Sequence, residues 1–218
     1  GWATSSVMHG RSYGPGSDEP PCNLIINAAS HVSVLKACKY LDIQPRVIPL
    51  GSGRYTMDSD LVEKAMDDNT IGVVCVLGTT LTGAFDPIED IHKRIVAYNE
   101  AHGTDISIHV DAASGGFTVP FTHPDLLWDF RLPQVRSINV SGHKFGLVYV
   151  GLGWIIFRQR SDLPEDIIFN VNYLGAKEET YGLNFSRPVS PIMLQYFQFL
   201  RLGRNGYEQI MKCCMDNA

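Results

Sequence analysis

Apolar positions along the chain fall into two kinds of segment that alternate. Short runs rich in β-branched residues and bounded by turn residues predict strands, and longer stretches with helical spacing predict helices. The predicted strands are residues 24–27, 46–50, 72–77, 106–110, 137–140 and 153–157, and the predicted helices are residues 32–40, 60–67, 88–101 and 191–212. This alternation predicts an α/β layer structure with a mainly parallel sheet, in which the strands are buried on both faces.

Two segments lack this regularity. Residues 10–21 are rich in Gly, Pro and Ser, a composition that predicts a flexible surface loop. Residues 114–135 carry paired glycines and three prolines among aromatic residues, which predicts a structured loop packed over a site. Asp58 and Ser59 are candidate N-caps for the second predicted helix, and Pro87 suits the start of the third.

Composition narrows the class of protein. The chain has 218 residues, 44% of them hydrophobic, and a formal net charge of -5, which suits a globular protein with one good core. Because Lys and Arg are scattered singly, we expect neither nucleic acid nor an anionic membrane as a partner. No apolar run approaches the roughly 18 residues that a membrane span requires.

The cysteines bear on metal binding and on the compartment. Their number is odd and none of them has CxxC spacing, which argues against a disulfide framework and against a zinc site; they are Cys22, Cys38, Cys75, Cys213 and Cys214. We therefore expect no metal and a reducing compartment, the cytoplasm. Five of the seven histidines show no metal-ligand spacing and are expected to be structural or solvent-facing: His9, His92, His102, His109 and His123.

One lysine follows directly on a predicted strand, in Ser141-Gly142-His143-Lys144. A lysine at the carboxyl edge of a sheet, among apolar residues and beside a histidine, can become a neutral amine and form a Schiff base, because desolvation and a neighbouring cation lower its pKa. The alternative is an ordinary surface lysine in a turn, and this segment alone does not decide between them.

A carboxylate ends another apolar strand, in Val110-Asp111-Ala112-Ala113. An aspartate in such a place costs several kcal/mol unless a cation meets it. The protonated ring nitrogen of a pyridoxal cofactor is such a cation, and the small alanines would let a planar ring approach. The alternative is an aspartate that caps the next helix.

These two motifs carry a resemblance. Together with residues 128–133, 169–175 and 184–188, they resemble the group II pyridoxal-phosphate-dependent amino-acid decarboxylases, and in particular the glutamate branch, from about Leu24 to the end of the chain. The resemblance implies an α/β large domain of the fold type I, PLP-dependent transferase-like class over residues 23–218, with its mainly parallel sheet flanked by helices. It also implies an irregular segment over residues 1–22 and a carboxyl-terminal small domain that is absent.

The implied activity is decarboxylation of L-glutamate to 4-aminobutyrate and CO2 with pyridoxal 5'-phosphate, by a homo-oligomer of two or more chains. Because family members take the arginine for the substrate α-carboxylate from the small domain, this chain alone is expected to release little CO2. Two alternatives stay open. The protein could be another decarboxylase of the group, with an aromatic or acidic amino acid as substrate, or a truncated, non-catalytic relative.

The resemblance also implies roles for the residues near the two motifs. Lys144 would bind the cofactor covalently, be displaced by the substrate amine and later help to release the product. Asp111 would pair with the ring nitrogen, Ala113 would lie against one face of the ring, and Thr80 would line the site near the ring substituents.

Further roles are implied for residues that lie farther along the chain. Ser141 and His143 would contact the phosphate and neighbouring cofactor atoms, and Tyr173 would help to protonate the product carbon. In Thr4-Ser5-Ser6, Ser5 and Ser6 resemble a remnant of the turn that binds the phosphate.

His31 falls where family members stack a residue on the cofactor ring. Bacterial glutamate decarboxylases have glutamine at that position, and histidine is usual in the aromatic and several other branches. A histidine can stack on the ring and hydrogen-bond toward the reacting carboxylate, so the chemistry is retained while the substrate is less well defined. From the sequence alone, His31 could also be a solvent-facing residue at a helix start.

Overall fold

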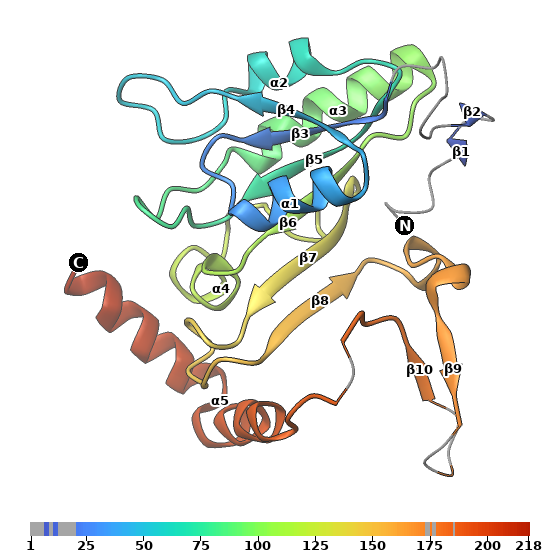
Figure 1. The fold of residues 1–218 in the computed structure, drawn as a ribbon. Helices are drawn as coiled ribbons and strands as arrows, with labels where there is room; N and C mark the ends of the chain where they lie inside the picture. Colours follow the sequence, from blue (N-terminus) through green and yellow to red (C-terminus); the bar gives the residue numbers. More distant parts are fainter. Residues whose placement is uncertain (1–6, 9–10, 13–20, 173–174, 176–177, 185) are drawn as a thin grey trace.

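A six-stranded sheet forms the centre of the protein (Figure 1). The computed structural model describes residues 7–8, 11–12, 21–172, 175, 178–184 and 186–218. The strands lie in the order β4 (Gln44–Ile48), β3 (Asn23–Asn27), β5 (Thr70–Val76), β6 (Ser107–Asp111), β7 (Val135–Ser141) and β8 (Gly153–Phe157). All neighbours pair in parallel except β8, which is antiparallel to β7. The predicted α/β fold with a mainly parallel sheet is confirmed.

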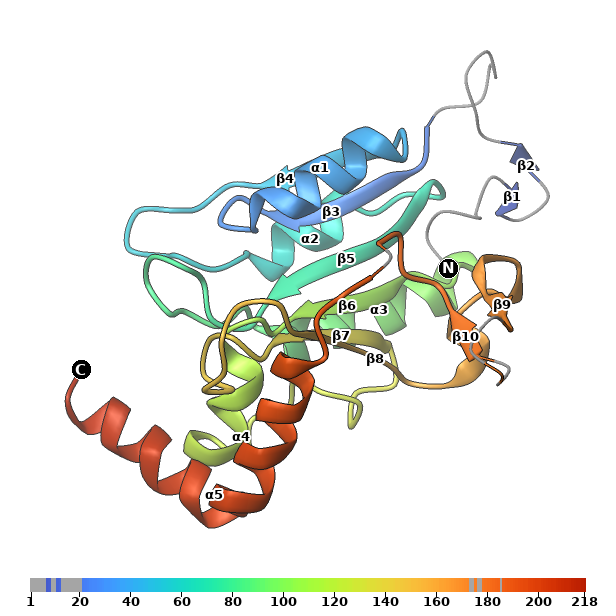
Figure 2. The ribbon, with the colours of Figure 1, turned by 60° about the horizontal axis from the view of Figure 1, so that its bottom comes forward.

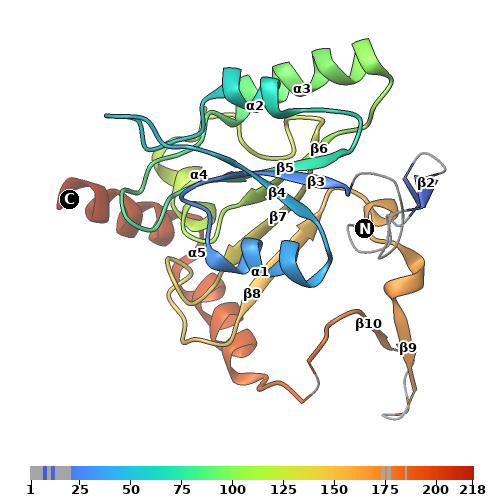
Figure 3. The same cartoon turned by 45° about the horizontal axis from the view of Figure 1, so that its top comes forward.

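Helices cover both faces of this sheet, as Figure 3 shows. Helix α1 (Val32–Tyr40) lies on one face, and α2 (Ser59–Ala65) and α3 (Ile88–His102) lie on the other. Each face has its own apolar core: Leu24, Ile26 and Val74 pack with the α1 side chain Cys38, whereas Ile25 and Val73 belong to the larger cluster on the α2 and α3 face. Burial on this scale is the main stabilising term of such a domain.

The prediction that the strands are buried on both faces is correct only for the centre of the sheet. Every residue of β3 and β5 is buried. In β6, buried Ile108 and Val110 alternate with half-buried His109 and Asp111, so one face of this strand carries polar side chains. Strand β7 also carries polar residues on one face, and the edge strands β4 and β8 are largely exposed.

The remaining elements surround the sheet (Figure 2). They are two antiparallel pairs, β1 (Val7–Met8) with β2 (Arg11–Ser12) and β9 (Phe169–Val171) with β10 (Glu178–Thr180), the 3-10 turns η1 (Gly115–Phe117), η2 (Arg160–Asp162) and η3 (Glu165–Ile167), and the helices α4 (Val119–Thr122) and α5 (Ser190–Asp216). The flexible loop predicted over residues 10–21 lies mostly outside the described residues, and its described part includes β2. No helix among the described residues combines the length and the apolar character of a membrane span.

The sequence signals at the helix starts are largely confirmed. Helix α1 spans the predicted residues. The Asp58 side chain caps α2 by accepting hydrogen bonds from the backbone N–H groups of Asp60 and Leu61, and Pro87 is the N-cap residue of α3. Helix α5 differs from the single straight helix that was predicted, because it bends at Gly203, where φ is 56° and ψ is -168°.

The segment 114–135 is ordered, as predicted. Its first residue, Ser114, accepts a hydrogen bond from Lys144, and Phe117 and Phe121 pack on α5. The segment contributes apolar side chains to the large core, and the ring of Phe117 lies 5.7 Å from that of Tyr207 on α5. Phe121 stacks on the same tyrosine at 5.9 Å. The aromatic residues are used to attach α5 to the domain, because aromatic pairs add to the free energy gained from burial.

A close approach of two loops fixes the edge of the sheet where the parallel strands end. A β-carbon at Gly115 would lie 2.4 Å from the backbone oxygen of Leu77. The backbone N–H of Gly115 donates to that same oxygen at 2.9 Å. The chain that follows β6 can therefore contact the chain that follows β5 only if residue 115 lacks a side chain.

We expect Gly115→Ala to lower the free energy of unfolding by about 1–3 kcal/mol, because the added methyl group must displace backbone. The control is Gly153→Ala, where a β-carbon would find the oxygen of Val140 at an ordinary 3.9 Å. Chemical denaturation of both variants checks the difference. Equal losses in the two variants would contradict the close approach.

Candidate active site

A cavity of about 290 Å³ lies where β5, β6 and β7 end and α1 begins. It collects all the predicted site residues that the structure describes: His31, Thr80, Asp111, Ala113, Ser141, His143 and Lys144. Ser5, Ser6 and Tyr173 lie outside the described residues. The carboxyl ends of parallel strands meet at one edge of a sheet, which is why residues more than a hundred positions apart share this cavity.

Asp111 is held in one orientation by two donors. Its Oδ1 atom accepts a hydrogen bond of 3.0 Å from Asn139 Nδ2 and one of 3.1 Å from the backbone N–H of Ala113. Both bonds are to Oδ1, so the described neighbours leave Oδ2 to accept a bond from a ligand.

A chain of hydrogen bonds continues from Asp111 through Asn139 to His109 and Ser137. Because Asn139 donates to Asp111 through its nitrogen, its Oδ1 atom must accept from His109 Nε2 at 2.8 Å. His109 Nδ1 then accepts from the Ser137 hydroxyl at 2.7 Å. Burial lowers the pKa of His109, which keeps the imidazole neutral, as this tautomer requires.

Of the two expectations for His109, structural or solvent-facing, the structure agrees with the first, since the side chain is half-buried beneath the site. Asn139 was missed altogether. A signal for both was present in the sequence, because Ser137, Asn139 and Ser141 alternate along one strand and predict a polar face with period two.

Lys144 lies at the rim of the cavity. Its Nζ atom donates to the Ser114 hydroxyl at 3.4 Å, and the side chain is exposed. The cavity that Lys144 lines has both polar and apolar residues: Ser141 and His143 lie in the same lining as Ala29, Val76 and Ala113. His143 is itself oriented by a bond of 3.2 Å from Nδ1 to the Leu152 carbonyl oxygen.

His31 is the N-cap of α1 and lines the cavity as well. Its Nδ1 atom accepts from the Ser33 backbone N–H at 3.2 Å and lies 2.8 Å from the Ser33 hydroxyl. It is exposed at a helix start, as the alternative interpretation held, yet this capping bond fixes the ring beside the cavity. Capping thus fixes the orientation of a side chain that can lie against a planar ligand.

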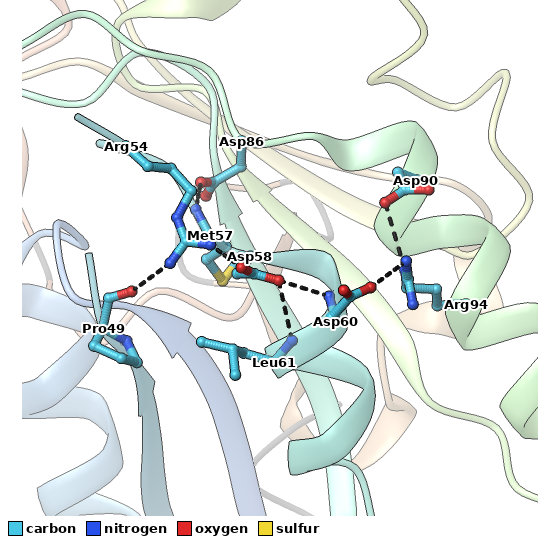
Figure 4. Close-up of polar contacts among 9 residues, drawn as sticks. All are labelled: Pro49, Arg54, Met57, Asp58, Asp60, Leu61, Asp86, Asp90 and Arg94. Carbon is cyan, nitrogen blue, oxygen red and sulfur yellow. Dashed lines mark hydrogen bonds and ion pairs between the residues drawn. The ribbon is translucent and has the colours of Figure 1, made fainter. Parts of the chain in front are cut away.

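A buried carboxylate that the sequence did not signal lies beneath the site. Asp86 is 4% exposed. Its Oδ1 atom accepts from Asn27 Nδ2 at 2.7 Å and from the Met57 N–H at 2.8 Å, and its Oδ2 atom accepts from the Val76 N–H at 2.7 Å. These bonds join the ends of β3 and β5 to the segment that leads into α2, part of which is drawn in Figure 4.

That segment is held from its other side by Arg54. Its guanidinium forms an ion pair with Asp58 and donates to the Pro49 carbonyl oxygen at 3.4 Å (Figure 4). Asp58 in turn caps α2, as described above. The contacts of Arg54 and Asp58 therefore hold the segment between β4 and α2 in the position in which the Met57 N–H donates to Asp86.

The domain is mainly parallel α/β, and one cavity at the carboxyl edge of its sheet holds a lysine and an oriented carboxylate. This arrangement is typical of enzymes that bind a cofactor aldehyde through a lysine. The chain belongs to the family of pyridoxal-dependent decarboxylases, whose conserved-domain model matches residues 21–218. Similar solved structures are pyridoxal-phosphate-dependent decarboxylases of fold type I, as the resemblance implied.

Individual relatives are similar over most of the chain. It is 48% identical over 217 residues to a glutamate decarboxylase of Aliivibrio fischeri and 47% identical over 208 residues to glutamate decarboxylase 5 of Arabidopsis thaliana. These alignments cover 100% and 95% of this chain but 46% and 42% of the relatives. The structure of a Lactobacillus brevis glutamate decarboxylase matches with a TM-score of 0.85 and 43% identity, over 88% of this chain and 44% of that one. The chain thus spans less than half the length of these relatives.

The residues of the cavity fit pyridoxal phosphate. Lys144 offers an amine for the aldehyde carbon, and Asp111 offers a carboxylate oxygen for the protonated ring nitrogen. The small side chain of Ala113 leaves room for the ring, and Thr80, Ser141 and His143 are polar groups that can meet its substituents. Among the described residues, no cluster of His, Cys, Asp or Glu suited to a metal ion is present.

The Asp86 carboxyl gives a prediction about pH. Burial raises its pKa above the ordinary value of 3.8, against the opposing effect of its three hydrogen-bond donors. A raised folded-state pKa means that the folded protein binds more protons than the unfolded chain. The contribution of Asp86 to stability is therefore full below pH 3.8 and declines as the pH rises through the raised pKa.

We expect the free energy of unfolding of the wild-type chain, minus that of Asp86→Asn, to decrease over this pH range. The asparagine cannot titrate, and its NH2 group would face a backbone donor, so the variant is also destabilised, by about 1–3 kcal/mol. Urea denaturation at several pH values checks both statements. Asp166→Asn, at an exposed position of η3, is the control and should leave the pH dependence unchanged; a difference for Asp86→Asn that rises with pH would contradict the assignment.

Proposed function

We propose that the protein of which this chain is a part decarboxylates L-glutamate with pyridoxal 5'-phosphate. The observation that carries the proposal is the single cavity that holds Lys144 and the oriented Asp111, in a chain 43–48% identical to glutamate decarboxylases. The residue roles follow from the resemblance and from the geometry described above.

Lys144 would hold the cofactor through its aldehyde carbon and give up this bond to the substrate amine. Bound pyridoxal phosphate supplies an electron sink conjugated with the substrate nitrogen. Asp111 would accept the N–H of the protonated ring nitrogen, and the bonds from Asn139 and Ala113 hold that carboxylate in place. His31, fixed as the cap of α1 beside the cavity, would contact the ring and the departing carboxylate.

The choice of an acidic amino acid rests on the relatives. Lys144 offers an amine, Asp111 is the carboxylate among the lining residues, and His31 and His143 add hydrogen-bonding groups. An acidic substrate is proposed over an aromatic one because the relatives that align with most of this chain are glutamate decarboxylases.

The balance of protons gives the reaction an external signature. The α-carboxylate of glutamate leaves as CO2, and a proton takes its place on the α-carbon to give 4-aminobutyrate. One proton is consumed from solution in each turnover, so the reaction makes the medium more alkaline. Tyr173, which the resemblance implies as a proton donor, is part of this proposal.

We also propose the oligomeric state, the compartment and the partner of the protein. We propose a homo-oligomer of two or more chains, because α5 exposes large apolar side chains such as Met193, Phe197 and Leu200. The cytoplasm is proposed because all five cysteines are free thiols in the structure. A small amino acid, rather than nucleic acid or a membrane, is proposed as the partner because the net charge is -5.

The test of cofactor binding is the visible absorbance of the chain mixed with pyridoxal phosphate. We expect a band that is lost in Lys144→Ala, because among the described residues Lys144 is the lysine that lines the cavity. Lys39→Ala, which removes an exposed lysine of α1, is the control and should keep the band. A wild-type chain without the band would overturn the assignment of Lys144.

Substrate choice is tested on the full-length protein, because the chain alone is expected to release little CO2, by the release of labelled CO2 from glutamate, aspartate and an aromatic amino acid. Release from glutamate that depends on Lys144 supports the proposal. Preference for another amino acid would favour a different decarboxylase of the family, which the histidine at position 31 keeps as an alternative. Cofactor binding without release from any substrate would mark the chain as non-catalytic.

A further inference from the structure

The turn that carries Lys144 is weakly held by its own backbone. The N–H groups of Lys144 and Val148 reach the oxygens of Ser141 and Gly142 at 3.4 Å each, and the Leu147 N–H reaches the Lys144 oxygen at 3.2 Å. Leu147 has φ of 65°, in the left-handed region that is unfavourable for a branched side chain. Bonds this long contribute little, so the turn needs support from elsewhere to keep one conformation.

Helix α5 supplies that support through the carbonyl oxygen of Gly146. Gln195 Nε2 donates to this oxygen at 2.9 Å, and the Tyr207 hydroxyl donates to it at 2.9 Å. Gln195 Nε2 also donates to the Tyr207 hydroxyl oxygen at 3.1 Å, which closes a triangle. Gln195 is 0% exposed and Tyr207 is 3% exposed, so water does not compete for these bonds.

Two glycines on either side of Lys144 leave the space that Gln195 occupies. A β-carbon at Gly142 would lie 2.7 Å from Gln195 Oε1, and so would a β-carbon at Gly146. The amide therefore fits against the turn because both positions lack a side chain. Its orientation is also fixed, because a rotated amide would place its oxygen against the Gly146 oxygen.

The bend in α5 brings the two donors together. In a straight helix, residues 195 and 207 would lie about 18 Å apart along the axis, too far to share one acceptor. At Gly203 the backbone adopts φ of 56° and ψ of -168°, a region essentially restricted to glycine. Figures 1 and 2 show the two parts of α5 lying at an angle to each other.

Tyr207 is held in place by aromatic side chains as well. Its ring lies 5.7 Å from that of Phe117, 5.9 Å from that of Phe121 and 6.1 Å from that of Phe199. Burial raises the pKa of the phenol, so the hydroxyl keeps its proton and acts as a donor. The segment that follows Asp111 along the chain thus helps to support the turn that carries Lys144.

We propose that Gln195 and Tyr207 are positioning residues for Lys144, which act through the Gly146 carbonyl and are brought together by the bend at Gly203. The inference rests on the proposed function, because it assigns to Lys144 the role of binding the cofactor. It adds that α5, which supplies none of the lining residues of the cavity, sets the position of the Lys144 amine.

The test uses the 218-residue chain and variants that keep side-chain volume while removing donors: Gln195→Met, Tyr207→Phe and the double variant. The controls on the same helix are Gln209→Met, at an exposed position, and Tyr196→Phe, at a side chain that is 58% exposed. Each protein is mixed with pyridoxal phosphate and reduced with borohydride, and peptide mapping gives the share of label on Lys144 relative to the other lysines.

We expect a loss of about threefold in that share for each single variant and of about tenfold or more for the double variant, because only the latter leaves the buried carbonyl with no donor. The controls should match the wild-type chain. Gly203→Ala should lower the share of label on Lys144 about as much as Tyr207→Phe does. The two changes combined should lower it little further, since both remove the same bond. A double variant labelled like the wild-type chain would overturn the proposal.

A second measurement does not involve the cofactor. Hydrogen exchange of the Leu147 amide, which donates to the Lys144 oxygen at 3.2 Å, should accelerate in the variants at temperatures well below their melting transitions. A purely structural role would lower the melting temperature without this local change. If the double variant does not fold, the two single variants decide the question by the same comparison.

The two measurements also separate this inference from the proposed function. A wild-type chain that is not labelled selectively at Lys144 contradicts the proposed function, while accelerated exchange in the variants would still support the role of Gln195 and Tyr207 in holding the turn. Selective labelling that is equal in all variants contradicts the inference alone.

Discussion

The carboxylate of Asp86 accepts hydrogen bonds from three segments that the rest of the site depends on. A carboxylate buried to this extent is costly unless donors surround it, and Asn27, Met57 and Val76 supply them. Asn27 also accepts from the Ala29 N–H at 2.7 Å, which shapes the turn that leads to His31. Val76 ends the strand that leads to Thr80. The buried Asp86 carboxylate therefore positions the segments that carry His31 and Thr80, which form the first half of the cavity wall.

The second half of the wall relies on two further sets of hydrogen bonds. From the sheet, Ser137, His109 and Asn139 hold the carboxylate of Asp111 from beneath. From α5, Gln195 and Tyr207 hold the turn that carries Lys144. The two sets approach from different elements, so a change in one can move the lysine without moving the carboxylate. Independent support of this kind allows the distance between an amine and its partner to be set closely.

Much of the fold follows from local patterns. Helix α1 and strand β8 have the predicted bounds, because helical spacing and β-branched runs are short-range signals. The motifs around Asp111 and Lys144 predicted one shared site, because each follows a strand of a parallel sheet. The packing of distant segments did not follow from such patterns. Phe117 and Phe121 of the segment 114–135 pack on α5, and His109, expected to be structural or solvent-facing, contacts Asn139.

The sequence by itself determined the α/β class and the succession along the chain of the six sheet strands and of helices α1, α2, α3 and α5. These depend on periodicity and residue type, which are local properties of the chain. Asp111 and Lys144 were assigned to one site through the resemblance of their motifs to a known family. Only the tertiary structure decided that Asp86 supports the cavity from beneath and that α5 bends at Gly203 to bring Tyr207 to the Gly146 oxygen. Such contacts join residues many positions apart. Their free energy comes from burying and satisfying polar groups, which no local pattern records.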